Sequence, residues 1–141
     1  MDDTICREWI RAALKARRKA YAPYSRYLVG AALLCEDGTV FTGCNIENAS
    51  YGATICAERT ALFSAVAAGQ RHFAALAIVS GPEGADETDL PWPSPCGICR
   101  QALREFVNPA DFEVILARSE REYRVLTLEQ LLPESFGPDY L

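Results

Sequence analysis

Two short cysteine segments, 40 residues apart, constrain the fold of this chain more than any other feature. One begins at Cys56, the other carries Cys96 and Cys99, and each stands at the predicted start of a helix. Cysteines spaced i, i+3 in the first turn of a helix place both sulfurs on one side, where they can share a tetrahedral metal ion. The helix N-terminus also favours the thiolate that binds metals. We therefore expect a fold in which two helix N-termini face each other around one metal ion.

Hydrophobic periodicity and turn signals predict the elements around these segments. The expected helices are residues 4–20, 56–68, 96–106 and a short one that opens with the capping-box pattern at Thr127. The expected strands are residues 28–35, 39–46, 73–80, 112–117 and 122–126, with a loop over 81–93. This order of helices and strands indicates one α/β domain over residues 1–141. We expect three layers, α/β/α, around a mixed five-stranded sheet.

Composition limits the partners and the compartment. The chain has a net charge of −5, whereas nucleic-acid binders need clustered positive charge. The one basic run, residues 17–19, is expected to be a solvated face at a helix end. No apolar stretch reaches the about 18 residues of a membrane span, and the acidic N-terminus lacks a signal-peptide core. We therefore expect a cytoplasmic protein that binds neither nucleic acid nor membrane. In that reducing compartment, six cysteines indicate metal binding or catalysis rather than disulfides.

Three thiolates, from Cys56, Cys96 and Cys99, predict a zinc ion with an open coordination position. Structural zinc sites usually have four protein ligands, whereas catalytic sites keep one position for water. His72, the only histidine, follows the far end of the predicted helix over 56–68 and is expected at the surface. Glu58 is close enough to the metal to move protons without being a ligand. Since zinc lowers the pKa of bound water towards about 7, the segments predict hydrolytic chemistry.

The charge of an all-thiolate site calls for a nearby cation. Zn²⁺ with three thiolates carries a net charge of −1, which weakens it as a Lewis acid. A guanidinium that donates a hydrogen bond to a ligand sulfur would draw charge away from the metal. We favour Arg59 for this role, because the two helix starts should face each other. Arg100 also follows a ligand segment, and a surface ion pair is an equally good interpretation of it.

The two segments together match the signature of zinc deaminases, in which H-x-E or its all-cysteine variant is followed by P-C-x-x-C. Beyond the metal segments, the chain resembles the small homotetrameric cytidine deaminase family. The matching stretches are residues 22–25, 29–32, 43–49, 56–61 and 131–138. The resemblance implies a zinc enzyme of pyrimidine salvage that deaminates free cytidine and deoxycytidine. It also implies a homotetramer with active sites at subunit boundaries.

The resemblance assigns substrate roles to further residues. It implies that Glu58 is the proton shuttle and that Asn45 and Glu47 bind the ribose hydroxyls. The Ala57 N–H is implied as a contact to the base carbonyl, and Tyr27 lies where the family usually has a phenylalanine beside the base. The residues implied to come from neighbouring subunits are Ala49, Tyr51 and Phe136.

Several of these residues also have a purely structural interpretation. Asn45 and Glu47 could form a solvated strand end with an Asx-type turn, and Phe136 could dock on its own domain. Trp92, in the loop over 81–93, is expected to cover an edge of the core, with a place at the substrate mouth as the alternative.

Three other functions stay open from the sequence. The first is the same chemistry on another aminopyrimidine nucleoside, such as a blasticidin-type antibiotic. The second is a polynucleotide-editing deaminase, against which the acidic composition argues. The third is a non-enzymatic zinc or dithiol protein, and its redox form would have a disulfide between Cys96 and Cys99 and no metal.

Overall fold

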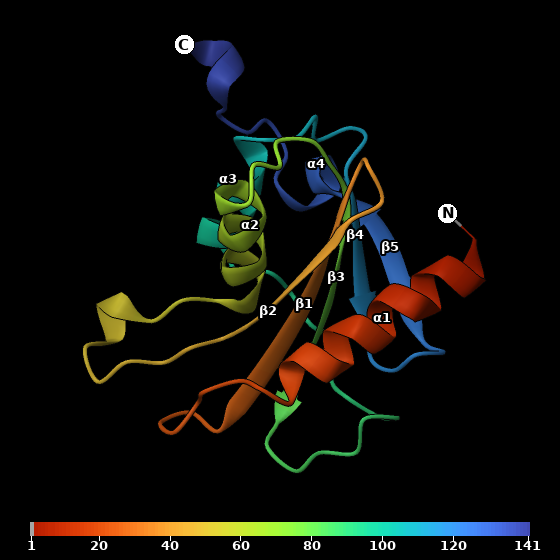
Figure 1. Ribbon diagram of the computed structural model, residues 1–141, viewed down its shortest axis with the longest axis vertical. Helices are drawn as coiled ribbons and strands as arrows, with labels where there is room; N and C mark the ends of the chain where they lie inside the picture. Colours follow the sequence, from red (N-terminus) through yellow and green to blue (C-terminus); the bar gives the residue numbers. More distant parts are fainter. Residues whose placement is uncertain (1) are drawn as a thin grey trace.

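A mixed five-stranded sheet forms the middle layer in the computed structural model, which describes residues 2–141 (Figure 1). The strands are β1 Tyr27–Cys35, β2 Val40–Cys44, β3 Phe73–Pro82, β4 Glu113–Ala117 and β5 Tyr123–Thr127. They lie in the order β2-β1-β3-β4-β5, and only the β3–β4 pair is parallel. The helices are α1 Asp3–Arg17, α2 Ala57–Ala67, α3 Gly97–Arg104 and α4 Leu128–Leu131, with 3-10 turns η1 Tyr51–Ala53 and η2 Pro138–Tyr140.

Helices cover both faces of the sheet, which confirms the predicted three-layer α/β/α fold (Figure 1). Helix α1 packs on one face over Ala77 and Val79 of β3. Helices α2, α3 and α4 pack on the other face over Leu76 and Ile78. Because successive side chains of a strand point to opposite faces, β3 is apolar on both, as its continuous apolar run predicts.

Two glycines let the helix backbones touch the sheet. A Cβ on Gly30 of β1 would overlap the backbone of α1 near Ala13, and a Cβ on Gly43 of β2 would overlap α2 near Ala57 and Ala61. The glycines therefore set how closely each helical layer approaches the sheet. For α2 this approach also sets the distance between the sheet and the N-terminus of the helix, where the first cysteine segment lies.

The predicted ends of the elements hold to within two residues, apart from α1. This helix ends at Arg17, three residues before the predicted end. Tyr21 instead joins the strand-like segment after β2: its N–H donates to the Asn45 carbonyl at 3.0 Å, and its carbonyl accepts from Glu47 N–H at 2.8 Å. These backbone bonds require the chain to leave the helix before Tyr21.

The basic run at the end of α1 is not a solvated face throughout, and the expectation is wrong for Arg17. This side chain is 3% exposed. Its Nε donates to the Leu28 carbonyl at 3.1 Å, and its Nη2 donates to the carbonyls of Gly81 and Pro82 at 2.9 and 2.8 Å. A buried guanidinium is tolerated when its donors are satisfied in this way. Arg17 thus joins the end of α1 to the start of β1 and the end of β3.

Helix α3 holds the chain segment that follows α4. Gln101 Nε2 donates to the Phe136 carbonyl at 2.9 Å. One turn on, Arg104 donates to Ser135 Oγ at 2.8 Å and pairs with Asp139 at 2.7 Å. The last residues of the chain are therefore fastened to the same helix that carries the second cysteine segment.

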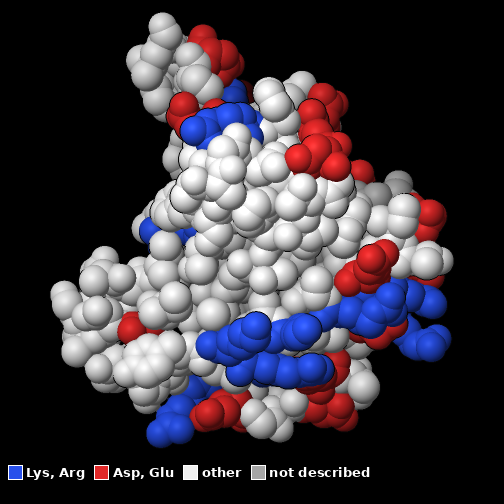
Figure 2. All heavy atoms as spheres, in the orientation of Figure 1, with Lys and Arg blue, Asp and Glu red and all other residues white. Residues whose placement is uncertain are grey.

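Figure 2 shows a basic band along the outer face of α1. Arg11 pairs with Glu120, and Arg18, just after the helix, pairs with Glu87, so acidic side chains neutralise part of this band. Lys15 on the same face is exposed. Within residues 2–141, no helix has the length and apolar character needed to span a membrane.

Candidate active site

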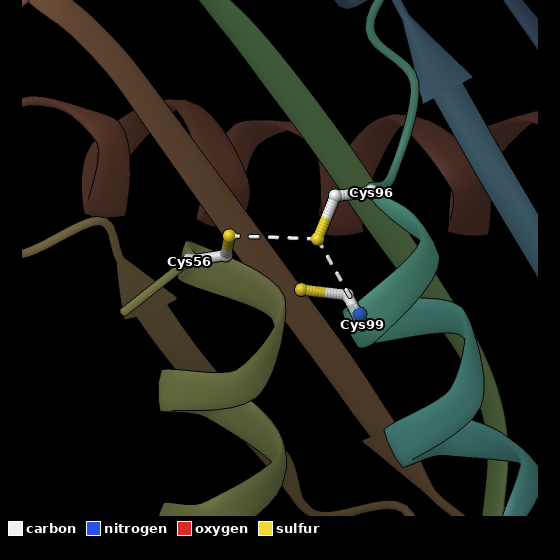
Figure 3. A group of neighbouring side chains, drawn as sticks. All are labelled: Cys56, Cys96 and Cys99. Carbon is white, nitrogen blue, oxygen red and sulfur yellow. Dashed lines mark hydrogen bonds between the residues drawn. The ribbon is translucent and has the colours of Figure 1, made fainter. Parts of the chain in front are cut away.

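The structure brings the three predicted ligands together at the N-termini of α2 and α3 (Figure 3). Cys56 is the N-cap of α2, Cys96 is the N-cap of α3, and Cys99 lies in the first turn of α3. All three sulfurs lie within 4.8 Å of one another. Cys56 Sγ and Cys96 Sγ are 3.7 Å apart, and zinc–sulfur bonds of about 2.3 Å in a tetrahedron put two ligand sulfurs about 3.8 Å apart. The three cysteines therefore fit a zinc ion.

No disulfide joins the three cysteine sulfurs. All six cysteines, each within the described residues 2–141, are free, and 3.7 Å far exceeds a disulfide bond of about 2.05 Å. Cys96 Sγ accepts a hydrogen bond from Cys99 N–H at 3.4 Å, which caps α3 and turns this sulfur towards Cys56. Cys56 makes no side-chain capping bond, so its sulfur is available to a metal.

The electrostatics of the cluster favour thiolate at Cys56. A hydrogen bond from the Cys99 thiol lowers the pKa of Cys56 to about 5, and Arg59 adds to this effect. Arg59 Nη2 donates to Cys56 Sγ at 3.6 Å, and this bond raises the pKa of Arg59. Arg100 makes no such contact, because it donates instead to Ser94 Oγ and to the carbonyls of the Pro95 and Leu131 backbone. Of the two arginines, only Arg59 can draw charge from a ligand sulfur.

Glu58 lies beside the cysteines in a cavity of about 250 Å³. Its side chain is 4% exposed, and burial raises its pKa to about 7. A carboxyl group with this pKa can both gain and lose a proton near neutral pH, as a proton-transfer catalyst requires. The cavity is slightly smaller than the roughly 300–1,000 Å³ of pockets for drug-sized ligands, which suits a small metabolite.

Asn45 and Tyr27 line the same cavity. Asn45 Oδ1 accepts from Val29 N–H at 2.9 Å, and its Nδ2 donates to the Tyr27 carbonyl at 2.9 Å, so the side chain bridges to strand β1. The Tyr27 hydroxyl, which has no counterpart in phenylalanine, lies 3.4 Å from Ser80 Oγ. Sequence reasoning missed Ser80, whose only signal was a polar residue at the end of an apolar strand.

Glu47 lies in a neighbouring cavity of about 360 Å³ rather than in the one beside Glu58. Its carboxylate accepts from the N–H groups of Tyr24 and Ser25 at 2.9 and 3.1 Å and from the Ser25 hydroxyl. The hydrogen bond from Ser25 lowers the pKa of Glu47. Thr54 lines both cavities, so the two lie next to each other.

The residues implied to serve neighbouring subunits lie at the surface of this chain. Ala49 is exposed, Tyr51 is 74% exposed, and Phe136 is 54% exposed. Within its own chain, the Phe136 ring packs on the Tyr140 ring, with the two ring centroids 5.3 Å apart. Ala57, in contrast, is fully buried directly after Cys56.

Trp92 lines the cavity, and the expectation that it covers a core edge is wrong. Leu90, two residues earlier, is fully buried and fills the core instead, which leaves Trp92 39% exposed at the cavity. His72 is exposed, as predicted.

This geometry defines a class of protein. Three cysteines that fit zinc leave one tetrahedral position for water, and a carboxyl group able to exchange protons lies in the same cavity. Zinc deaminases combine a cysteine-rich zinc site with a glutamate that is not a ligand. The fold and the site therefore place this chain among the zinc-dependent deaminases.

Comparison with known proteins narrows this class. Residues 4–113 match the family described as the cytidine and deoxycytidylate deaminase zinc-binding region, and the chain belongs to this family. It is 48% identical over 132 residues to cytidine deaminase from Sporosarcina psychrophila, covering 94% of this chain and 91% of that protein. It is 50% identical to the Halalkalibacterium halodurans cytidine deaminase over 90% of each chain. The crystal structure of cytidine deaminase from Burkholderia pseudomallei superimposes with a TM-score of 0.80 at 51% identity, covering 92% of this chain and 97% of that one.

Proposed function

We propose that this protein hydrolytically deaminates free cytidine and deoxycytidine to uridine and deoxyuridine, with release of ammonia. The observation that carries the proposal is the buried Glu58 carboxyl group, which shares a cavity with Cys56 and Cys96 and has a pKa of about 7. The relatives named cytidine deaminase, about half identical over most of the chain, support the choice of substrate.

The mechanism assigns the proton transfers to Glu58. Cys56, Cys96 and Cys99 would hold the zinc ion, which would supply the Lewis acidity that makes water nucleophilic near neutral pH. Glu58 takes a proton from the water and passes it to N3 of the pyrimidine while the water oxygen adds to C4. Glu58 then moves the second proton from that oxygen to the amine on C4, the C–N bond breaks, and ammonia leaves. The carboxyl group ends in the protonation state in which it began.

Other side chains of the site position the substrate in this proposal. Tyr27 and Asn45 line the cavity beside Glu58, where the aromatic ring would pack on the base and the amide would meet the ribose. Glu47, in the adjacent cavity, would complete the ribose site, and the Ala57 N–H would meet the base carbonyl. Arg59 would adjust the metal charge through its bond to a ligand sulfur.

The proposal extends to assembly and cellular place. Exposed aromatic residues at the two cavities and on the C-terminal segment, and exposed Phe63 on α2 and Ile98 on α3, support burial against further copies of the chain. We propose a homotetramer to which neighbours contribute Ala49, Tyr51 and Phe136. Residues 1–141 would act as a single deaminase domain in the cytoplasm, in pyrimidine salvage.

Replacing Glu58 with glutamine tests the function. We expect turnover of cytidine, followed as a fall in absorbance near the cytidine maximum, to drop by about 10²–10⁴-fold because the proton shuttle is lost. Zinc content should remain about one per chain, since the cysteines are untouched. Glu105→Gln, at an exposed position after α3, should keep wild-type activity.

The same assay separates the competing functions. Cytidine, blasticidin and a single-stranded oligonucleotide are compared as substrates at equal concentration. Preferred turnover of blasticidin or of the oligonucleotide would replace the proposed substrate. Wild-type turnover by Glu58→Gln would refute the mechanism, and a metal-free protein with a disulfide between Cys96 and Cys99 would refute the enzyme.

A further inference from the structure

We infer that Trp92 is a substrate-binding residue, whose indole forms a wall of the cavity and contacts the nucleoside beside its reacting end. The inference rests on the proposed function and adds a substrate contact to it. Trp92 lines the cavity that also contains Glu58 and Cys96. With 39% of its surface exposed, the ring is open to a ligand while part of it is anchored in the protein.

The indole is held from outside the cavity by two arginines. The guanidinium carbon of Arg124, on β5, lies 4.3 Å from the Trp92 ring centroid, and that of Arg118 lies 5.7 Å away. Both distances are within the range of a cation–π contact. Arg118 is itself fixed by Asp89 and Glu122, each at 2.6 Å. The two arginines therefore hold the indole ring in position.

The chain on both sides of Trp92 is also fixed. Leu90 is fully buried, its N–H donates to the Arg118 carbonyl at 3.0 Å, and its carbonyl accepts from Arg118 Nε at 2.8 Å. After Trp92, Pro93 is buried and Cys96 caps α3. An aromatic side chain held at both ends and from behind is preorganised for contact with a planar ligand.

The contact affects binding rather than chemistry. In the proposed reaction the bonds change at C4, beside Glu58 and the cysteines, and an indole has no group that can transfer a proton to that position. Its interaction with the base or sugar is then equal in the ground state and the transition state. Such uniform binding lowers KM and leaves kcat unchanged.

Kinetics of Trp92 variants test the inference on the zinc-loaded protein. Trp92→Ala should raise KM for cytidine about tenfold, the order expected for losing one aromatic contact with a base, with kcat within about twofold. Trp92→Phe should restore most of the affinity because it keeps an aromatic face. Arg124→Ala, which removes only the support, should give an intermediate KM. Trp9→Phe, on α1 across the sheet, is the matched control and should leave KM unchanged.

A fluorescence titration reports the contact directly. In Trp9→Phe, Trp92 is the sole tryptophan of the chain, and saturating uridine, the product, should change its emission. An unchanged emission together with a wild-type KM in Trp92→Ala would overturn the inference while cytidine turnover keeps the proposed function. Failure of the wild-type protein to deaminate cytidine would instead overturn the function, and the uridine titration would still decide the contact.

Discussion

Replacing Gly43 with alanine should displace α2 and, with it, the candidate zinc site. A Cβ on Gly43 would lie 2.5 Å from the Ala57 carbonyl oxygen and 2.5 Å from the Ala61 nitrogen. Ordinary contact begins at 3.4 Å, so the α2 backbone must retreat by about 0.9 Å. Cys56 and Glu58 flank Ala57 and would move with it, which changes their position relative to the cysteines of α3.

This displacement is large on the scale of the site. The sulfurs of Cys56 and Cys96 are 3.7 Å apart, close to the about 3.8 Å that a tetrahedral zinc requires. A misplacement of about 1 Å in an active site can lower the rate about 100-fold, and overpacking alone costs about 1–3 kcal/mol of unfolding free energy. We therefore expect Gly43→Ala to lower both the zinc affinity and, about 100-fold, kcat for cytidine.

Gly30→Ala is the matched control on the opposite face of the sheet. Its Cβ would lie 2.0 Å from the Ala13 carbonyl oxygen, so α1 must retreat by about 1.4 Å. Helix α1 contributes no residue to the cavity, so this variant should unfold more readily than the wild type but keep its kcat and zinc affinity. We would compare the two variants by three measurements: thermal unfolding for stability, chelator competition for zinc affinity, and initial rates below both melting temperatures for kcat. Equal kcat in the two variants would refute the reasoning.

Two further predictions concern Arg17 and Cys56. Arg17→Met should lower the free energy of unfolding, measured with urea, by about 3 kcal/mol, because the carbonyls of Leu28, Gly81 and Pro82 lose their donor. The exposed change Lys19→Met should alter it by less than about 0.5 kcal/mol, and equal losses would contradict this account. Removal of zinc with a chelator should abolish turnover and leave Cys56 as the thiol that iodoacetamide labels first at neutral pH. A hydrogen bond from the Cys99 thiol lowers the pKa of Cys56 to about 5, so Cys56 is a thiolate above that pH. Burial raises the pKa of Cys44, which keeps Cys44 as the less reactive thiol. Peptide mass spectrometry reports the order of labelling, and earlier labelling of Cys44 would count against the prediction.

Features that depend on neighbouring residues could be predicted from the sequence. The capping box at Thr127 is formed as expected, with Thr127 and Gln130 each accepting from the other's backbone N–H. The helix starts at Cys56 and Cys96 follow equally local rules. Since a three-cysteine zinc site confines both helix starts to one place, these local signals also indicated how the two halves of the chain meet.

Features that depend on distant partners could not be predicted. The sequence alone predicts a solvated Arg17. Only the fold brings the carbonyls of Leu28 and Gly81, which accept its hydrogen bonds, to this side chain. The place of Trp92 depends on whether the core is closed by that ring or by Leu90, a choice that composition does not reveal. Burial and side-chain pairing of this kind follow from the path of the backbone.

The attachment of the C-terminal segment to α3 links that segment to the candidate metal site. Its first turn presents Cys96 and Cys99, and its later residues Gln101 and Arg104 hold the segment that carries Phe136. Because α3 has only eight residues, the cysteines at its start and the residues that hold the C-terminal segment lie within about two turns of one helix. In the proposed tetramer, one helix would thus position both the metal ligands of its own subunit and the aromatic ring of Phe136 offered to a neighbour.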